Sequence, residues 1–238
     1  KQEQQELLNI VIVGGGATGI EVAGILSEMK KFVLPNDYPD MSSSLMHIYL
    51  IEAGPRLLAG MSEESSAHAE QFLREMGVNI LLNKRVVDYR DHKVVLEDGT
   101  EIATRTFIWV SGVTGVTIGN LDASLIGRGG RIKVDSFNRV EGMNNVFAIG
   151  DQCIQLADEN YPNGHPQLAQ VAIQQGELLA KNLIRMEKGQ EMKPFHYRNL
   201  GSMATVGRNR AVAEFSKVKM QGWFAWVMWL VVHLRSIL

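Results

Sequence analysis

Three glycines at the spacing Gly14-x-Gly16-x-x-Gly19 are the residues in this sequence best suited to chemistry. They directly follow an apolar run and directly precede apolar residues at helical spacing. In that setting the first glycine allows a tight turn, the second lets the backbone approach a pyrophosphate, and the third lets helix and strand pack closely. Free N–H groups at the start of the helix attract phosphate oxygens. The pattern predicts a dinucleotide-binding site.

An acidic residue at the end of the next predicted strand is expected to complete this site. Glu52 directly follows residues 46–51, and a carboxylate there can accept hydrogen bonds from both ribose hydroxyls and repel a 2′-phosphate. We therefore expect NADH to be preferred over NADPH. The separation from Gly19 exceeds the usual distance of about 20 residues, so the helix and loop across residues 30–44 must be long. The alternative is a simple glycine turn with an exposed glutamate.

Two strand-and-helix units are expected to position these residues. The continuous apolar run at residues 8–13 is typical of a strand buried on both faces of a parallel sheet. Residues 17–34 have helical periodicity, which we expect Pro35 and the Asn36-Asp37 and Tyr38-Pro39 steps to end. Residues 46–51 and 61–76 repeat the pattern as a second strand and a second helix.

Turn-forming residues divide the rest of the chain into shorter elements. Ser62 is the expected cap of the second helix and Gly77 its expected stop. Strands are then predicted at residues 78–82, 86–90, 93–96, 106–110, 131–134 and 145–149, with a helix at 166–188 and a hairpin over 200–215. The sequence thus predicts an α/β fold with a Rossmann-like parallel sheet and a small antiparallel layer.

Composition excludes several classes of function. The 238 residues carry a net charge of −2, which provides no electrostatic footprint for nucleic acid. A single cysteine, Cys153, excludes an internal disulfide, and we expect it to be a small buried apolar residue. The six histidines lack the spacing of metal ligands, so no metal site is expected.

Four stretches of the sequence resemble a known family of flavoproteins. They are VGGGATGIEVAG at 13–24, FIWVSGV at 107–113, NVFAIGD at 145–151 and AQVAIQQG at 169–176. Together they resemble the pyridine-nucleotide-disulfide oxidoreductase superfamily and, within it, the type II NADH dehydrogenases. The resemblance implies an FAD-dependent enzyme that passes electrons from NADH to a membrane quinone without pumping protons.

The resemblance also implies which residues contact the two cofactors, FAD and NADH. Asp151 is expected at the ribityl and pyrophosphate part of FAD. The full implied set is Gly14, Gly15, Gly16, Ala17, Thr18, Gly19, Glu52, Ser111, Gly112, Gly150, Asp151 and Ala169. The family has a further glycine pattern for FAD ahead of the NADH domain, which this sequence lacks. We therefore expect a fragment with an incomplete FAD-type domain, inactive in isolation. The expected boundaries are 1–113 for the NADH domain, 114–195 for part of the FAD domain, and 196–238 for a hairpin and membrane-associating segment.

Three further side chains are candidates for catalysis. Gln170 and Gln174 are four residues apart on the predicted helix and share a face, where their amides could hydrogen-bond a quinone carbonyl. A solvated or capping glutamine pair is the alternative. Glu21 follows the third glycine, as in the family, and is the candidate for coupling the sites or handling protons. It could instead simply complement the helix dipole.

The end of the chain has the composition of a membrane-surface segment. Residues 222–234 contain no Lys, Arg, Asp or Glu, are rich in tryptophan, and are flanked by Lys217, Lys219 and Arg235. The segment is shorter than the roughly 20 residues that span a bilayer, but an amphipathic helix can lie on one. A core helix or a dimer contact is the alternative. The expected partners are NADH, quinone, the membrane surface and a second copy of the chain, at the cytoplasmic face of the inner (plasma) membrane.

Two other functions remain open on these residues. A soluble NADH-dependent flavin oxidoreductase or NADH oxidase, or the less favoured disulfide reductase branch of the superfamily, would explain the glycine pattern. None of these would explain the glutamine-rich helix or the tryptophan-rich end. A non-catalytic nucleotide-binding domain would need neither.

Overall fold

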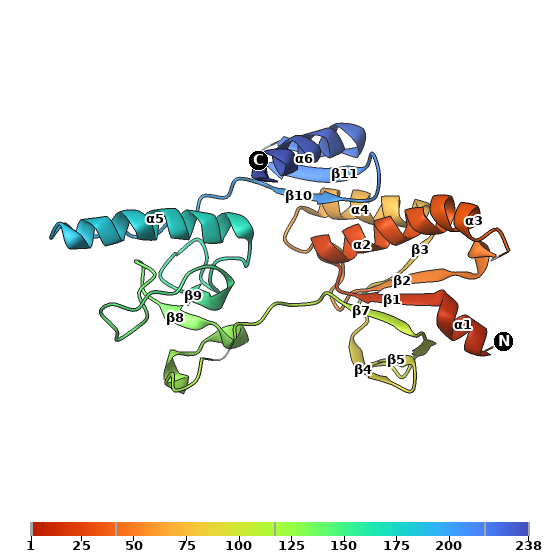
Figure 1. The fold of residues 1–238 in the computed structure, drawn as a ribbon, viewed down its shortest axis with the longest axis horizontal. Helices are drawn as coiled ribbons and strands as arrows, with labels where there is room; N and C mark the ends of the chain where they lie inside the picture. The colour runs from red at the N-terminus through yellow and green to blue at the C-terminus, as the bar shows by residue number, and fades with distance from the viewer. Residues whose placement is uncertain (1, 41, 117, 217, 238) are drawn as a thin grey trace. The chain divides into compact units, whose positions relative to one another are not determined.

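The computed structural model describes residues 2–40, 42–116, 118–216 and 218–237 (Figure 1). The chain forms two compact units: residues 1–111 together with 201–238, and residues 112–200. We call them unit 1 and unit 2. The C-terminal segment thus belongs to unit 1 although it follows unit 2 in the sequence.

A four-stranded parallel sheet forms the centre of unit 1. Its strands are β1 (Asn9–Val13), β2 (His47–Ile51), β3 (Val78–Leu81) and β7 (Thr106–Trp109), in the order β3-β2-β1-β7. Val13 is the partner of both Ile51 in β2 and Trp109 in β7. The predicted Rossmann-like sheet is confirmed, and the carboxyl ends of its three adjacent strands lie at one edge.

Alternating side chains of β1 supply two separate cores. Ile10 and Ile12 face helices α2 (Ala17–Glu28) and α4 (Glu63–Glu75) in one apolar cluster, whereas Val11 and Val13 belong to another. This alternation is why the strand is apolar throughout, since each face of the sheet must be covered. Figure 1 shows the helices on one face and β4 and β5 on the other.

The antiparallel layer covers the second face. It consists of β4 (Val86–Arg90), β5 (Lys93–Leu96) and β6 (Glu101–Ala103), and Val94 and Leu96 of β5 are buried against the parallel sheet. The strands β4 and β5 were predicted. The sequence analysis missed β6 because it has only three residues, and one of these is charged.

The helical segment that begins with α2 consists of three parts. After Glu28 the chain passes through a π-helical stretch, η1 (Met29–Val33), into α3 (Leu34–Asp37). Pro35 lies in the first turn of α3, where its missing N–H is no loss. The helical segment therefore continues past Pro35 and ends at Asp37, within the Pro35–Pro39 stretch where the sequence predicts its end. The boundaries of α4 are confirmed, because Ser62 caps it through the N–H of Ser65.

The C-terminal segment docks on the helices of unit 1. The predicted hairpin is confirmed as β10 (Ser202–Thr205) and β11 (Ala211–Phe215), followed by β12 (Val218–Gln221) and α6 (Gly222–Ile237). A Cβ at Gly24 of α2 would lie only 2.6 Å from the backbone nitrogen of Gly207, so these two segments touch through bare backbone. Lys217, which we expected to flank α6, lies outside the described residues. Within the described chain, no helix has the length and apolar character needed to cross a bilayer.

Two further elements of unit 1 escaped the sequence analysis because each is short. Helix α1 (Gln2–Leu8) occupies the polar N-terminal stretch, and β12 is recognisable only through its pairing with β11. A stretch this short has too few positions for a clear periodic signal, so only the folded chain shows these elements.

Unit 2 is built around one long helix and a two-stranded parallel sheet. The helix α5 (Ala169–Glu187) was predicted, as was the short strand β8 (Ile132–Val134), which pairs with β9 (Cys153–Gln155). The predicted strand at residues 145–149 is wrong. Among the described residues this stretch has only an isolated bridge, between Phe147 and Arg139, and no neighbouring strand to extend a ladder.

Candidate nucleotide-binding site

Three strand ends of unit 1 meet where the dinucleotide is expected. Gly14 follows β1, Glu52 follows β2, and Ser111 comes two residues after β7. Because β2 and β7 lie on opposite sides of β1, the strand order reverses at this point. Ligands of open parallel sheets bind outside the carboxyl ends of the strands at such a switch point. The structure thus brings the predicted residues of unit 1 to a suitable place.

The geometry of the three glycines fits a pyrophosphate cradle. Gly14 has a φ of 117°, and a Cβ there would lie 3.0 Å from the backbone of Ser111. A Cβ at Gly19 would lie 1.8 Å from the carbonyl oxygen of Gly14, so only glycine lets the helix pack this close to the turn. A Cβ added at Gly16 would meet no atom within 4 Å, which leaves open space where a phosphate must approach.

The start of α2 is open to solvent at this turn. Gly16, Ala17 and Thr18 are exposed, and Gly16 caps the helix without any side-chain hydrogen bond. The first N–H groups of a helix have no partner within the helix and carry a partial positive charge. An anion at this end would satisfy them.

Glu52 has two backbone partners in the loops around the site. Its Oε2 accepts a hydrogen bond from the N–H of Gly15 at 2.6 Å, and its Oε1 accepts one from Gly54 at 2.7 Å. A carboxylate has about four acceptor positions, so lone pairs remain for ribose hydroxyls. The structure therefore assigns Glu52 a role that the sequence analysis missed: it ties the glycine turn to the end of β2.

Glu21 lies on the face of α2 that contacts the C-terminal hairpin. Its Oε1 accepts a hydrogen bond from the N–H of Thr205 at 3.4 Å. This contact ties α2 to β10, and the expected role in proton handling stays a prediction.

In unit 2 a buried glutamine, Gln175, holds the Gly150–Asp151 turn. Gly150 has a φ of 67° and donates its N–H to Oε1 of Gln175 at 2.7 Å. Gln175 is only 1% exposed, whereas Asp151 is exposed to solvent. The sequence analysis missed Gln175, although its spacing of four from the buried Val171 was the available signal.

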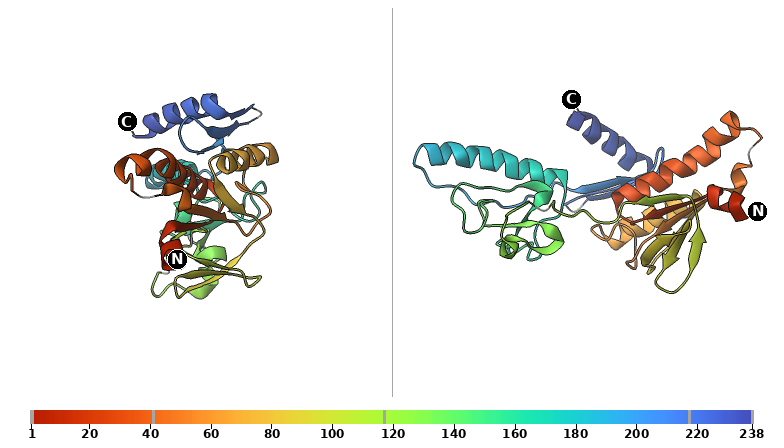
Figure 2. Two further views of the ribbon diagram at one scale, coloured as in Figure 1. Left: turned by 90° about the vertical axis from the view of Figure 1, so that its right-hand side faces the viewer. Right: turned by 60° about the horizontal axis from the view of Figure 1, so that its bottom comes forward.

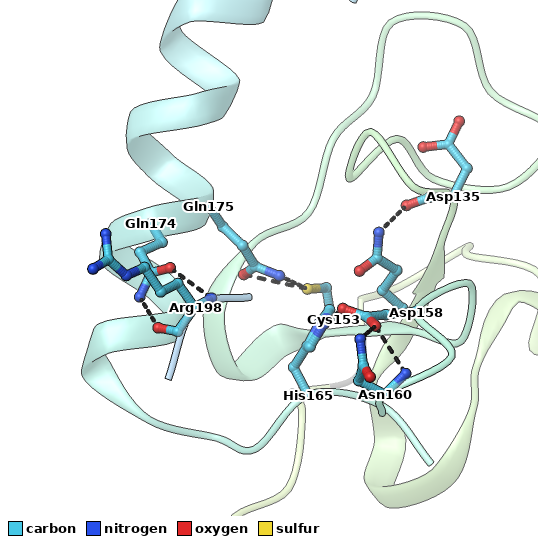
Figure 3. A network of polar contacts seen from close by, with 9 residues as sticks. Asp135, Cys153, Asp158, Asn160, His165, Gln174, Gln175 and Arg198 are labelled. Carbon is cyan, nitrogen blue, oxygen red and sulfur yellow. Dashed lines mark hydrogen bonds and ion pairs between the residues drawn. The ribbon is translucent and has the colours of Figure 1, made fainter. Parts of the chain in front are cut away.

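Cys153 lies beside Gln175, as Figure 3 shows. Its thiol is buried and free, and burial raises its pKa. The expectation of a small buried apolar residue is confirmed.

The two glutamines proposed for quinone contact share a face of α5, and both reach the chain that precedes β10. Gln174 donates to the carbonyl of Arg198 at 2.9 Å and accepts from its N–H at 3.1 Å. Gln170 accepts from the N–H of Leu200 at 3.0 Å. Ala169, the first residue of α5, is exposed. The glutamine amides therefore have a positioning role within unit 2, and quinone contact stays a prediction. Gly112, with a φ of 82°, begins this unit.

A buried hydrogen bond between His165 and Asp158 holds the loop that leads into α5. His165 Nε2 lies 3.0 Å from Oδ2 of Asp158, and both side chains are 4% exposed. The hydrogen bond from His165 lowers the pKa of Asp158. The rings of Tyr161, Phe195 and Tyr197 pack around the imidazole. Across the described residues, no three His, Cys, Asp or Glu side chains gather as a metal site would require.

The sheet and the glycine turn define the class of protein, a dinucleotide-binding α/β protein. Comparison with known proteins agrees with this class. The sequence matches the pyridine nucleotide-disulphide oxidoreductase family over residues 1–176. This chain belongs to that family.

Relatives of the chain include a type II NADH:quinone oxidoreductase, NdhA, of Mycobacterium tuberculosis. It is 35% identical over 245 residues, which cover 98% of this chain and 51% of that protein. A mitochondrial internal alternative NAD(P)H-ubiquinone oxidoreductase A1 of Arabidopsis thaliana is 32% identical over 255 residues, covering 100% of this chain and 49% of that protein. The chain spans about half the length of these relatives.

A solved structure shares the fold of the whole chain. NDH2 from Plasmodium falciparum in complex with NADH superposes with a TM-score of 0.88 at 21% identity, covering 100% of this chain and 64% of that one. At this identity the likeness shows the fold alone.

Proposed function

We propose that this chain binds NADH through unit 1 and works as part of an FAD-dependent NADH:quinone oxidoreductase that pumps no protons. The observation that supports this most strongly is the meeting of Gly14, Gly16 and Glu52 at the carboxyl edge of the parallel sheet. The names of the relatives, which describe NADH:quinone and NAD(P)H-ubiquinone oxidoreductases, support the same reaction.

Each residue of the site has a binding task in this proposal. The N–H groups from Gly16 to Thr18 hold the pyrophosphate of NADH, and the partial positive charge of the α2 terminus favours its oxygens. Glu52 accepts hydrogen bonds from the ribose hydroxyls, while its charge disfavours a 2′-phosphate. Because Glu52 also binds Gly15, occupation of the ribose site and the shape of the glycine turn are linked.

The residues of unit 2 fit a second cofactor. The exposed Asp151 and the first turn of α5 at Ala169 would hold FAD, and a Cβ at Gly150 would lie only 3.3 Å from the Cβ of Ala172, so this turn packs onto the helix. When bound, FAD supplies the redox chemistry between NADH and quinone. In the proposal, Ser111 and Gly112 also contact the cofactors, Gln170 and Gln174 contact quinone, and Glu21 couples the sites or handles protons.

We propose that α6 attaches the protein peripherally to the membrane that holds the quinone, at its cytoplasmic face. Trp223 and Phe224 are 55% and 71% exposed at the start of this helix, where aromatic side chains suit a lipid interface. A homodimer is proposed as the working assembly, and light scattering after size exclusion tests it.

The reaction is tested on a longer polypeptide that adds the family's FAD glycine pattern ahead of residue 1. Its NADH oxidation is assayed with added FAD and with a water-soluble quinone, oxygen or a disulfide as the acceptor. Quinone-dependent turnover is the expected result. Turnover with oxygen or disulfide alone would identify a soluble flavin oxidoreductase instead, and NADH binding with no turnover under any condition would identify a nucleotide-binding domain.

A further inference from the structure

A pocket of unit 1 remains that nucleotide binding does not use. It has a volume of about 210 Å³ and lies between the C-terminal parts of α2 and α4 and the turn that joins β10 to β11. Its lining contains three cationic side chains, two carboxylates, Phe32 and Met76. The charged members are Glu28, Lys31, Glu75, Arg208 and Arg210.

Contacts within the pocket pair some of these charged side chains with each other and leave others free to bind a ligand. Glu75 forms an ion pair with Arg210 at 2.9 Å, and Glu28 accepts a hydrogen bond from the backbone N–H of Arg208. The ammonium of Lys31 lies over the ring of Phe32, at 5.2 Å from its centre. No ion pair joins the side chains of Lys31 or Arg208 to a carboxylate in the described part of the chain. The pocket therefore presents two cations that an anion can bind.

An exposed apolar stripe borders this pocket along α2 and η1. Ile25, Met29, Phe32 and Val33 are 56%, 39%, 59% and 42% exposed, and their spacing places them along one side of the helical segment. Phe32 belongs to both the stripe and the pocket. A ligand that fills both must have an anionic head and an apolar body.

The aromatic start of α6 is close to the same turn. Gly222 bridges to Ala211, the residue that follows Arg210, so Trp223 and Phe224 begin next to the β10–β11 turn. Within unit 1, Figures 1 and 2 show α2 and α6 on the same side of the parallel sheet.

We propose that this pocket is a lipid-binding site, in which Lys31 and Arg208 bind the phosphate of an anionic phospholipid and the α2 stripe contacts its acyl region. A soluble phosphate would bind the cations without contacting the apolar stripe. Cations beside exposed apolar side chains instead match an anionic bilayer surface. The inference rests on the proposed attachment to a membrane and adds to it a second contact, on the nucleotide-binding domain itself.

Flotation of the purified chain with vesicles tests the site. The vesicles contain phosphatidylcholine alone or phosphatidylcholine with phosphatidylglycerol. The wild type is expected to prefer the anionic vesicles, and the double variant Lys31→Gln, Arg208→Gln should lose binding to them on the order of tenfold. The matched control, Lys181→Gln with Lys188→Gln, removes two exposed cations of α5 and the residue after it, and should bind as the wild type does. Phe32→Ser should weaken binding to both kinds of vesicle.

Several results would overturn the proposal. Equal loss in the control pair would mean that only net charge matters. Unchanged vesicle binding by the Lys31 and Arg208 variant would restrict membrane contact to α6. If inorganic phosphate binds the pocket while vesicles do not, the pocket is a site for a free anion. A wild type that floats with neither vesicle would also overturn it. NADH titration of the same samples shows separately whether the nucleotide site stands.

Discussion

At the residue scale, Glu52 holds two loops and faces the expected ribose site. Its carboxylate accepts hydrogen bonds from the backbone N–H groups of Gly15 and Gly54. A charged carboxylate accepts such bonds more strongly than the neutral amide of a glutamine would. We expect Glu52→Gln to weaken NADH binding by about tenfold and to reduce the preference over NADPH. Calorimetric titration measures both.

Glu97→Gln is the matched control for this substitution. Glu97 is an exposed carboxylate 3.8 Å from Arg85, so its loss should leave nucleotide affinity unchanged. If Glu52→Gln binds both nucleotides as the wild type does, the carboxylate takes no part in the site.

Gln175 is the residue on which the turn of unit 2 depends. Replacement by Leu removes the acceptor for the N–H of Gly150, and leaving such a group unsatisfied costs about 1–3 kcal/mol. Faster amide hydrogen exchange at Gly150 is the expected result. Gln174→Leu is the control: its hydrogen-bond partner Arg198 is exposed, so the amide exchange rate of Gly150 should not change. Equal exchange rates at Gly150 in both variants would contradict the role given to Gln175.

The Asp158–His165 pair predicts a dependence on pH. Because the pKa of Asp158 is lowered in the folded protein, its carboxylate stabilises unit 2 at pH values above the ordinary aspartate pKa of about 3.9. That contribution is lost as the pH falls through the lower folded value. At neutral pH, Asp158→Asn should therefore exchange amide hydrogens over residues 158–165 faster than the wild type.

The difference between wild type and Asp158→Asn should shrink as the pH falls below about 4. Glu159→Gln, at an exposed neighbouring position, is the control and should resemble the wild type at every pH. A constant difference across the acid range would show that the charge of Asp158 contributes nothing.

At the scale of elements, close contact between α2 and the β10–β11 turn requires glycine. Alanine at position 24 improves helix propensity by at most about 1 kcal/mol, but its Cβ would meet the backbone of Gly207 at 2.6 Å. We expect Gly24→Ala to destabilise unit 1 by about 1–3 kcal/mol, as overpacking does. Tryptophan fluorescence during unfolding reports it, since all four tryptophans lie in unit 1.

Gly60→Ala provides the comparison, because nothing lies within 4 Å of a Cβ at that position. It should be neutral or slightly stabilising. A Gly24→Ala variant as stable as Gly60→Ala would mean that the hairpin does not pack as described.

Elements with a strong local pattern were predictable from sequence. The strand β1, the glycine turn and α4 with its Ser62 cap each carry their own signal within a few residues. Strands β6 and β12 become recognisable only through pairing with distant strands, and residues 145–149 have a strand pattern without a pairing partner in the described chain. In the site, Glu52 was predictable from its position, but its bonds to Gly15 and Gly54 depend on loop geometry.

At the scale of the whole molecule, the chain combines a complete nucleotide-binding core with a smaller second unit. Unit 1 buries both faces of its parallel sheet, whereas unit 2 has only two paired strands, β8 and β9, among the residues described. The relatives are about twice as long as this chain. NADH binding is accordingly the property that this chain should display by itself.

The most direct measurement is an amide NMR titration of the chain with NADH and, separately, with NADPH. The account predicts saturable binding of NADH, with the largest shift changes at Gly15, Gly16 and Thr18 and weaker binding of NADPH. Binding of neither nucleotide, tighter binding of NADPH, or shift changes remote from the glycine turn would contradict it.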